Sequence, residues 1–215
     1  MREYLPPPLS ADKPRAAVLF LHGVGADGRD LLSIGESWQP AFPDVQFVSV
    51  DAPEPFDMAP PGFGGHQWFS LKDFTIPAMT SGAAAATPGL HRYLDDLLQR
   101  LSLTADKLVL CGFSQGAMMA LYAGTRYPGG LAGIISYAGV LLAPDSLPKT
   151  VPPILLVHGD EDMVVPQTAS DQAAALLKRR GDSVSYHSIR GLGHGIDGTA
   201  IAHGTDALQE FLKTA

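Results

Sequence analysis

The chain has 215 residues, of which 46% are hydrophobic and only 17% are charged, and its formal net charge is −7 at pH 7. This length fits a single domain with a substantial core, and the composition excludes a disordered chain. The acidic balance, without any basic stripe, disfavours nucleic acid and anionic membranes as partners.

The cysteine count and the short apolar runs indicate the compartment. A single cysteine, Cys111, rules out an internal disulfide framework, as is usual in a reducing compartment. Residues 1–8 hold three consecutive prolines and no apolar run long enough for a signal peptide. Runs such as 16–21 and 154–157 are of strand length, far short of the roughly 20 residues that span a bilayer. We therefore expect a cytoplasmic protein with no integral membrane association.

The first part of the chain predicts a strand, a helix and a second strand. Residues 16–21 form a continuous apolar run, typical of a strand that is buried on both faces of a parallel sheet. A glycine-rich turn at 22–28 follows, and then come a modest helix around 31–38 and a strand at 45–50.

Residues 52–82 break every periodicity, because prolines and glycines are interleaved with aromatic residues such as Phe56. An irregular stretch of this length inside a compact domain is usually a functional lid or a linker. The aromatic content favours a lid or substrate-pocket loop, and the alternative is a surface excursion whose aromatics cap the core. Four residues of this stretch are candidates for the lining of a substrate pocket: Phe63, Trp68, Phe69 and Leu71.

Helices and strands alternate through the rest of the chain. Thr87 and Pro88 resemble the N-cap and first residue of an amphipathic helix that reaches Leu101. The other expected elements are strands at 107–111, 131–138, 154–157 and 184–189 and helices at 117–122, 168–180 and 199–212. This alternation predicts an α/β fold in one domain, 1–215, with a mostly parallel central sheet and helices on both faces.

The pentapeptide Gly112-Phe113-Ser114-Gln115-Gly116 lies between an expected strand and an expected helix. A Gly-x-Ser-x-Gly sequence between a strand and a helix is typical of the nucleophile elbow of α/β-hydrolases. This elbow is a sharp turn that strains the serine backbone and exposes its side chain. Glycine is needed two residues before and two after, because a Cβ there would collide with the neighbouring strand and helix. Ser114 is therefore the predicted nucleophile.

A serine hydroxyl needs a base to take its proton and a carboxylate to orient that base. In this fold class the chain order is the serine, then the Asp or Glu that supplies the carboxylate, then the His that acts as the base. The loop after the strand at 154–157 offers Asp160, Glu161 and Asp162. We expect Asp162 to be the acid, with Asp160 as the second choice. Glycines flank His194 in the loop after the next strand, which makes it the expected base.

Two backbone N–H groups are the expected donors to the negative charge of the tetrahedral intermediate. One belongs to Gln115, directly after the nucleophile, and the other to the loop after the first buried strand, where Val24 is the candidate. If Val24 is only a turn residue, the backbone shape would be the same without any ligand contact.

Five segments carry a family resemblance. They are Leu21-His22-Gly23-Val24-Gly25, Trp68-Phe69, the serine pentapeptide, His158-Gly159 with Asp162 and Val164-Val165-Pro166, and Gly193-His194. Together they resemble the phospholipase/carboxylesterase family, which includes acyl-protein thioesterases and small bacterial carboxylesterases.

The resemblance implies a serine carboxylesterase that hydrolyses short to medium acyl esters, or thioesters, through an acyl-enzyme and without a cofactor. It assigns Ser114, Asp162 and His194 as the triad. The chain departs from the family pattern at two positions. Ser70 stands where the family often has Asp, and Val24 stands where Leu is usual. Both departures concern the acyl pocket rather than the chemistry.

Other functions stay open. An acyltransferase would pass the acyl group to an acceptor other than water, and a ligand-binding α/β-hydrolase would keep the scaffold without turnover. More remotely, Gly23, Gly25 and Gly28 form a G-x-G-x-x-G after a strand, with Asp51 at the end of the next, as in a dinucleotide-binding oxidoreductase. The late and weak helix signal after Gly28 counts against it, because phosphate binding needs a helix that begins at the glycines.

Two further kinds of site are disfavoured. The sequence has no H-E-x-x-H or paired Cys/His spacing of a metal site. Cys111 precedes the elbow within the expected strand, so it is not the expected nucleophile.

Overall fold

The structure is a computed structural model and describes residues 1–4 and 13–213. The strands of its main sheet are β1 (Glu3–Tyr4), β2 (Ala16–Leu21), β3 (Val45–Val50), β6 (Leu108–Phe113), β7 (Gly133–Tyr137), β8 (Ile154–Gly159) and β9 (Val184–Ile189). A separate hairpin pairs β4 (Glu54–Pro55) with β5 (His66–Gln67). The prolines considered at 6–8 lie outside the described residues.

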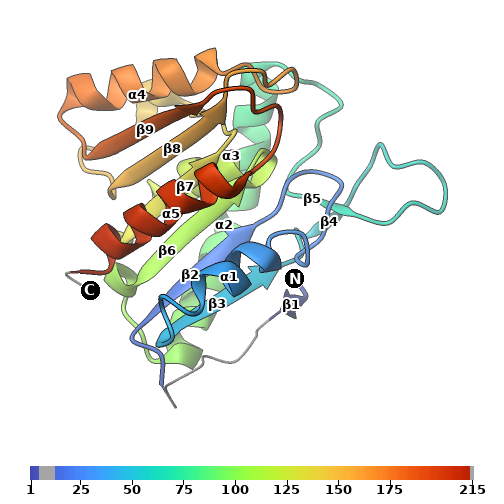
Figure 1. The fold of residues 1–215 in the computed structure, drawn as a ribbon. Coiled ribbons are helices and arrows are strands. Elements are labelled where there is room, and N and C mark those ends of the chain that lie inside the picture. The colour runs from blue at the N-terminus through green and yellow to red at the C-terminus, as the bar shows by residue number, and fades with distance from the viewer. Residues whose placement is uncertain (5–12, 214–215) are drawn as a thin grey trace.

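The described part of the chain has five α-helices, of which α5 follows the last strand (Figure 1). They are α1 (Leu32–Trp38), α2 (Ile76–Leu101), α3 (Gln115–Gly124), α4 (Thr168–Arg180) and α5 (Gly198–Phe211). Short 3₁₀ turns lie at Ala105–Lys107 and Pro144–Ser146.

The main sheet is parallel except at one edge. Its strand order is β1-β3-β2-β6-β7-β8-β9, and only the β1–β3 pair is antiparallel. Leu21 at the end of β2 pairs with Val50 of β3 and with Gly112 of β6, so the carboxyl ends of the central strands lie at one edge of the sheet. In open parallel sheets this edge is where binding sites form.

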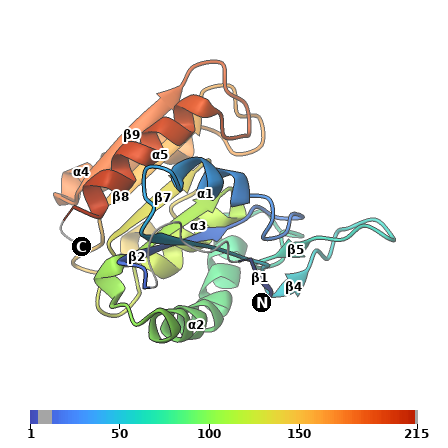
Figure 2. The ribbon, with the colours of Figure 1, turned by 60° about the horizontal axis from the view of Figure 1, so that its bottom comes forward.

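The sheet has a separate hydrophobic core on each face, because side chains alternate between the two faces along each strand. In β2, Ala17, Leu19 and Leu21 belong to one core while the residues between them belong to the other. Helices α2, α3 and α4 cover the first core, and α1 and α5 cover the second. Figure 2 shows α2 on one side of the sheet and α1 and α5 on the other.

Most of the elements expected from sequence are confirmed. The strands at 16–21, 45–50 and 184–189 correspond to β2, β3 and β9, and β9 forms an edge of the described sheet. Helix α4 spans the expected residues and is capped by Gly181, whose φ of 81° is the left-handed conformation that glycine adopts readily. The α/β fold with a mostly parallel sheet is thus confirmed.

The start predicted for the second helix is wrong. Helix α2 begins at Ile76, where the side chain of Thr75 accepts a hydrogen bond from the Ala78 N–H at 3.4 Å. Pro88 therefore lies inside the helix, and the Thr87 hydroxyl donates to the Ala83 carbonyl at 2.7 Å instead of capping a first turn. The irregular stretch that begins at residue 52 ends before residue 76, so it is shorter than expected.

A run of alanines explains why α2 begins before Thr87 and Pro88. Residues 83–86 are four consecutive alanines, the best helix formers, and they continue the helix up to the threonine and proline that otherwise suggest a start. Met79 and Ala83 are also buried against the first core, so tertiary packing stabilises the early turns.

Replacing Thr75 by Ala removes this cap and should lower the free energy of unfolding by about 1 kcal/mol. Thr87→Ala is the matched control. We expect it to leave the free energy of unfolding within about 0.5 kcal/mol, because alanine is the better residue inside a helix. Urea denaturation measures both, and a larger loss in Thr87→Ala than in Thr75→Ala would contradict the observed helix start.

Candidate active site

Ser114 occupies a strained turn between β6 and α3. Its φ of 52° and ψ of −118° lie in a region that residues with a side chain rarely adopt. A Cβ on Gly116 would overlap the Leu21 carbonyl, and one on Gly112 would overlap the backbone of Gly116. The elbow therefore forms with the close backbone approaches expected from the pentapeptide.

The structure brings Ser114, His194 and Asp162 into one hydrogen-bonded series. The Oγ atom of Ser114 lies 2.9 Å from Nε2 of His194, and Nδ1 of His194 lies 2.7 Å from Oδ2 of Asp162. Because a carboxylate only accepts, the proton of His194 is on Nδ1, which leaves Nε2 free to accept from the serine hydroxyl. The Phe113 ring packs against the His194 ring, with centroids 4.9 Å apart.

The Asp162 carboxylate is buried, and hydrogen bonds hold it in place. Its Oδ1 accepts from the N–H groups of Val164 at 2.8 Å and Val165 at 2.9 Å. Burial acts to raise the pKa of this carboxyl, but the hydrogen bonds from His194, Val165 and Val164 outweigh it and lower the pKa below its usual value. The carboxylate is therefore ionised at neutral pH.

Asp160, the second choice for the acid, lies elsewhere. It is exposed, and its Oδ1 accepts from the N–H of Gly191 at 2.6 Å. Asp160 thus braces the loop that carries His194 without a hydrogen bond to the imidazole itself.

Val24 and Gln115, which carry the two expected oxyanion donors, both line the cavity at Ser114. Gln115 is the first residue of α3, where an N–H group has no acceptor within the helix. In the loop after β2, Gly25 donates to the His66 carbonyl and Ala26 to the Gly23 carbonyl, whereas the N–H of Val24 donates to no group within the described residues. Val24, Ser114 and Gln115 all line one cavity.

A buried histidine, His22, holds the loop that carries Val24 through two hydrogen bonds. The Nε2 atom of His22 accepts from the Ala52 N–H at 2.9 Å, and its Nδ1 lies 2.7 Å from the Gly23 carbonyl oxygen, to which it donates. Burial lowers the pKa of His22, so the ring is neutral, as these two hydrogen bonds require. The backbone before Val24 is therefore fixed.

The side chain of Gln115 links the elbow to the irregular stretch. Its Oε1 accepts from the Trp68 N–H at 2.9 Å, and its Nε2 donates to the Phe69 carbonyl at 2.7 Å. The Trp68 indole in turn donates to the His22 carbonyl at 3.0 Å. These buried hydrogen bonds tie the segment containing Trp68, the elbow and the loop after β2 into one unit.

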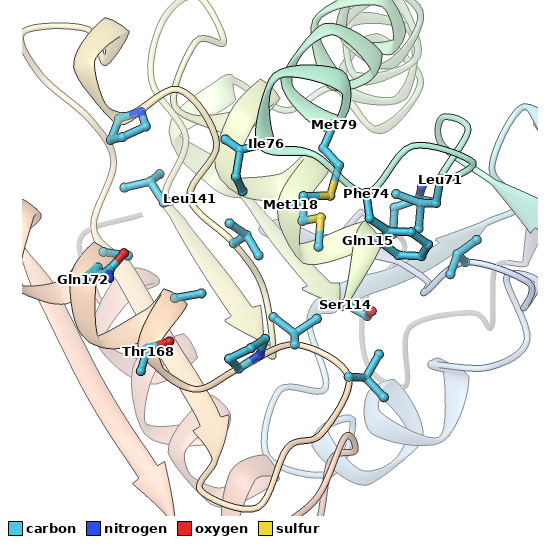
Figure 3. Close-up of a pocket in the computed structure, with 18 of the residues that line it drawn as sticks. Leu71, Phe74, Ile76, Met79, Ser114, Gln115, Met118, Leu141, Thr168 and Gln172 are labelled. Carbon is cyan, nitrogen blue, oxygen red and sulfur yellow. The ribbon is translucent and has the colours of Figure 1, made fainter.

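A cavity of about 850 Å³ opens at Ser114 (Figure 3). The irregular stretch and the start of α2 line it with Phe56, Met58, Leu71, Phe74, Ile76 and Met79. Helix α4 contributes Thr168, Ala169, Gln172, Ala173, Leu176 and Arg179. Figure 3 shows Leu71, Met79 and Met118 on the opposite side of the cavity from Thr168 and Gln172. The lining is largely apolar.

The structure corrects the expected pocket at three positions. Leu71 lines the cavity, but Phe63, Trp68 and Phe69 do not. Phe63 is 60% exposed, whereas Trp68 and Phe69 are buried in the core that α2 and α3 cover. The interpretation of aromatics as core caps is therefore correct for Trp68 and Phe69.

Helix α4 contributes a part of the lining that the sequence did not predict. Its small and apolar residues Ala169, Ala173 and Leu176 recur at helical spacing, which the sequence presents as an ordinary core face. Met118 was missed in the same way, although it lies one helical turn beyond Ser114 and therefore on the same side of α3.

The dinucleotide hypothesis does not fit the loop at 23–28. Helix α1 begins only at Leu32, so no helix starts at the glycines. Asp51 is buried and its Oδ1 already accepts from the Gly28 N–H at 2.8 Å. This acid holds the loop in place instead of facing a ribose.

Three other features of the described residues bear on the alternatives. Cys111 is fully buried, and burial raises the pKa of its thiol. No group of three or more His, Cys, Asp or Glu side chains in the described part of the chain could hold a metal ion. Across residues 1–4 and 13–213, no helix has the length and apolar character needed to cross a membrane.

Replacing Gln115 by Ala should leave the Trp68 N–H and the Phe69 carbonyl buried without partners. We expect the free energy of unfolding to fall by about 2–4 kcal/mol. Gln172→Ala, which removes an exposed glutamine of the same cavity, should change it by no more than about 0.5 kcal/mol. Equal stability of the two variants in urea denaturation would refute the linking role of Gln115.

Known proteins match nearly the whole chain. Residues 9–215 match the family described as Phospholipase/Carboxylesterase. Esterase YpfH of Escherichia coli K12 is 31% identical over 201 residues, which cover 93% of this chain and 85% of YpfH. Acyl-protein thioesterase 1 of Neurospora crassa is 30% identical over 215 residues, 92% of this chain and 85% of that protein. The crystal structure of esterase PE8 superposes with a TM-score of 0.90 at 38% identity, covering 97% of this chain and 98% of PE8.

Proposed function

Because the chain belongs to the phospholipase/carboxylesterase family of α/β-hydrolases, we propose that Ser114, His194 and Asp162 carry its catalysis through an acyl-enzyme. The family and its relatives make the chain a serine carboxylesterase or thioesterase. The observation that supports these three residues is the unbroken series of hydrogen bonds from Ser114 Oγ to Asp162.

In the acylation step, Nε2 of His194 takes the hydroxyl proton of Ser114 as Oγ attacks the acyl carbon. The N–H groups of Val24 and Gln115 hold the oxyanion that forms. Asp162 stabilises the imidazolium, which then gives its proton to the leaving alcohol or thiol. A water molecule, activated by His194, resolves the acyl-enzyme by the same steps.

The cavity supports an acyl substrate. A volume of about 850 Å³ with a largely apolar lining suits a short to medium acyl chain whose carbonyl reaches Ser114. An ester and a thioester present the same carbonyl carbon, so both belong to the proposed substrate class. The substrate-pocket role of the stretch at 52–82 is supported by Leu71, Phe74 and the other residues that it adds to the lining. A cytoplasmic location remains a prediction from the sequence.

The first test is the nucleophile. Replacing Ser114 by Ala should lower kcat by up to about 10⁶ on a p-nitrophenyl ester, judging from other triads. A spectrophotometric assay measures this, with and without an alcohol acceptor to distinguish hydrolysis from acyl transfer. Turnover near the wild-type rate in the variant would exclude Ser114 as the nucleophile.

The second test is the acid. Asp162→Asn should lower kcat by about 10⁴, because the amide stabilises the wrong tautomer of His194. Asp160→Asn is the matched control from the same loop and should lose only a few-fold in kcat, since Asp160 bonds to Gly191 and not to His194. If Asp160→Asn shows the larger loss, the assignment of the acid is wrong.

The third test is the cavity. Ala169→Phe fills space between α4 and Ser114, so the ratio of kcat/KM for octanoyl over acetyl esters should fall about tenfold or more. Ala175→Phe places the same side chain on an exposed position of α4 outside the cavity and should leave the ratio unchanged. An unchanged ratio in Ala169→Phe would show that the acyl chain binds elsewhere.

A further inference from the structure

His158 is the second-last residue of β8, and its ring lies beside the carboxylate of Asp162. None of its side chain is exposed, and none of the Asp162 side chain is exposed either. A buried histidine beside a buried carboxylate needs polar partners for both ring nitrogens. The identity of these partners shows what the ring does.

Both ring nitrogens have partners within 3 Å. The Nε2 atom lies 2.8 Å from the Val165 carbonyl oxygen, and Nδ1 lies 2.7 Å from the Ser170 hydroxyl. The Nε2 atom also lies 3.2 Å from Oδ2 of Asp162. A carbonyl oxygen and an ionised carboxylate only accept, so Nε2 carries a proton, while Nδ1 pairs with a hydroxyl that can donate or accept.

Oδ2 of Asp162 therefore lies between two imidazole rings. It is hydrogen-bonded to His194, whereas the Nε2 hydrogen bond of His158 goes to the Val165 carbonyl and its contact with Oδ2 is electrostatic. Nδ1 of His194 is on one side at 2.7 Å, and Nε2 of His158 is on the other at 3.2 Å. The second oxygen, Oδ1, is fixed by the N–H groups of Val164 and Val165. A carboxylate with donors on both oxygens resists rotation, which is what a fixed hydrogen bond to His194 needs.

We propose that His158 is a positioning residue, which holds the Asp162 carboxylate in the orientation that meets Nδ1 of His194. This inference rests on the proposed function of Asp162 and His194. His158 does not line the substrate cavity and has no hydrogen bond to Ser114, so it acts on the chemistry through Asp162 and through Val165, whose N–H holds the Asp162 carboxylate.

His158 also has a structural task, because its bonds to Val165 and Ser170 tie the acid loop to the start of α4. The two roles use different parts of the ring. The Nδ1 side bonds to Ser170 alone, whereas the Nε2 side faces the acid loop and Asp162. Side chains that replace either Nδ1 or Nε2 alone can therefore separate the structural role from the positioning role.

The experiment compares His158→Asn with His158→Gln. The Asn amide reaches the position of Nδ1 and keeps the Ser170 partner, whereas the Gln amide reaches the position of Nε2 and keeps the donor beside Asp162. We expect kcat to fall about tenfold in His158→Asn with KM within about twofold, and we expect His158→Gln to recover most of the loss. Ser170→Ala, which removes only the Nδ1 partner, should keep kcat within about threefold.

A spectroscopic measurement complements the kinetics. The proton on His194 Nδ1, which is hydrogen-bonded to Asp162, should give a low-field NMR resonance. We expect this resonance to move or broaden in His158→Asn and to stay in place in His158→Gln and Ser170→Ala. If His158→Asn does not fold, His158→Gln must still be folded, show this resonance and turn over at nearly the wild-type rate. Loss of the resonance or of turnover in a folded His158→Gln would overturn the proposal.

Two further outcomes would overturn it. A folded His158→Asn with wild-type kcat would show that Asp162 needs no support from His158. Equal losses of kcat in the Asn and Gln variants, together with equal losses of stability in urea, would show a purely structural role. Ser114→Ala, tested in parallel, separates these results from a failure of the proposed function, because its inactivity is independent of His158.

Discussion

The close contact between the end of β2 and the start of α3 is the constraint on which the rest of the site depends. The Leu21 carbonyl lies where a side chain at Gly116 would otherwise be, so α3 can begin directly against the sheet. This approach forces the sharp turn at Ser114 and its positive φ, at a cost on the order of 1–3 kcal/mol. Hydrogen bonds around the turn, such as that from the Ser114 N–H to the Tyr137 carbonyl, hold it in place.

The parallel sheet places the other parts of the site around this turn. Parallel strands bring the loops after β2, β6, β8 and β9 to one edge of the sheet, so Val24, Ser114, Asp162 and His194 meet although they are far apart in the chain. Buried hydrogen bonds then fix each loop. Gln115 connects the elbow to Trp68 and Phe69, and the hydrogen bond from His194 together with the backbone N–H groups after Asp162 keeps the Asp162 carboxylate ionised. The catalytic geometry is therefore a property of the sheet edge and its supporting loops rather than of any single motif.

The parts of the structure that sequence predicts well are those with a local physical cause. A continuous apolar run identifies β2 to the residue, because a strand buried on both faces admits few polar side chains, and the bounds expected for β3 are also confirmed. The elbow and the order of the acid and base follow from sterics and from the topology of the sheet. Local signals mislead at Thr87 and Pro88, because the preceding alanines and the packing of Met79 start α2 at Ile76, 12 residues before Pro88.

Other features depend on contacts between segments far apart in the chain, which periodicity does not describe. The cavity takes its walls from α4, α3 and the stretch before α2, and the parts contributed by α4 and α3 have on their own the pattern of ordinary core. His158 likewise appears within an apolar strand, and only the folded loop shows that its ring faces Asp162. Trp68 and Phe69 suggest a pocket by composition, but their backbone bonds to Gln115 place them in the core.

The most direct test of the account is to trap the acyl-enzyme and locate the modified residue. Trypsin should release residues 108–126 as one peptide that holds both Ser114 and Cys111, the two nucleophiles of this segment. After reaction with a slowly hydrolysed ester or a phosphonate analogue, tandem mass spectrometry should find one modification per chain, on Ser114. A modification on Cys111 or on another peptide, or full turnover without any trapped adduct, would contradict the central role of the elbow serine.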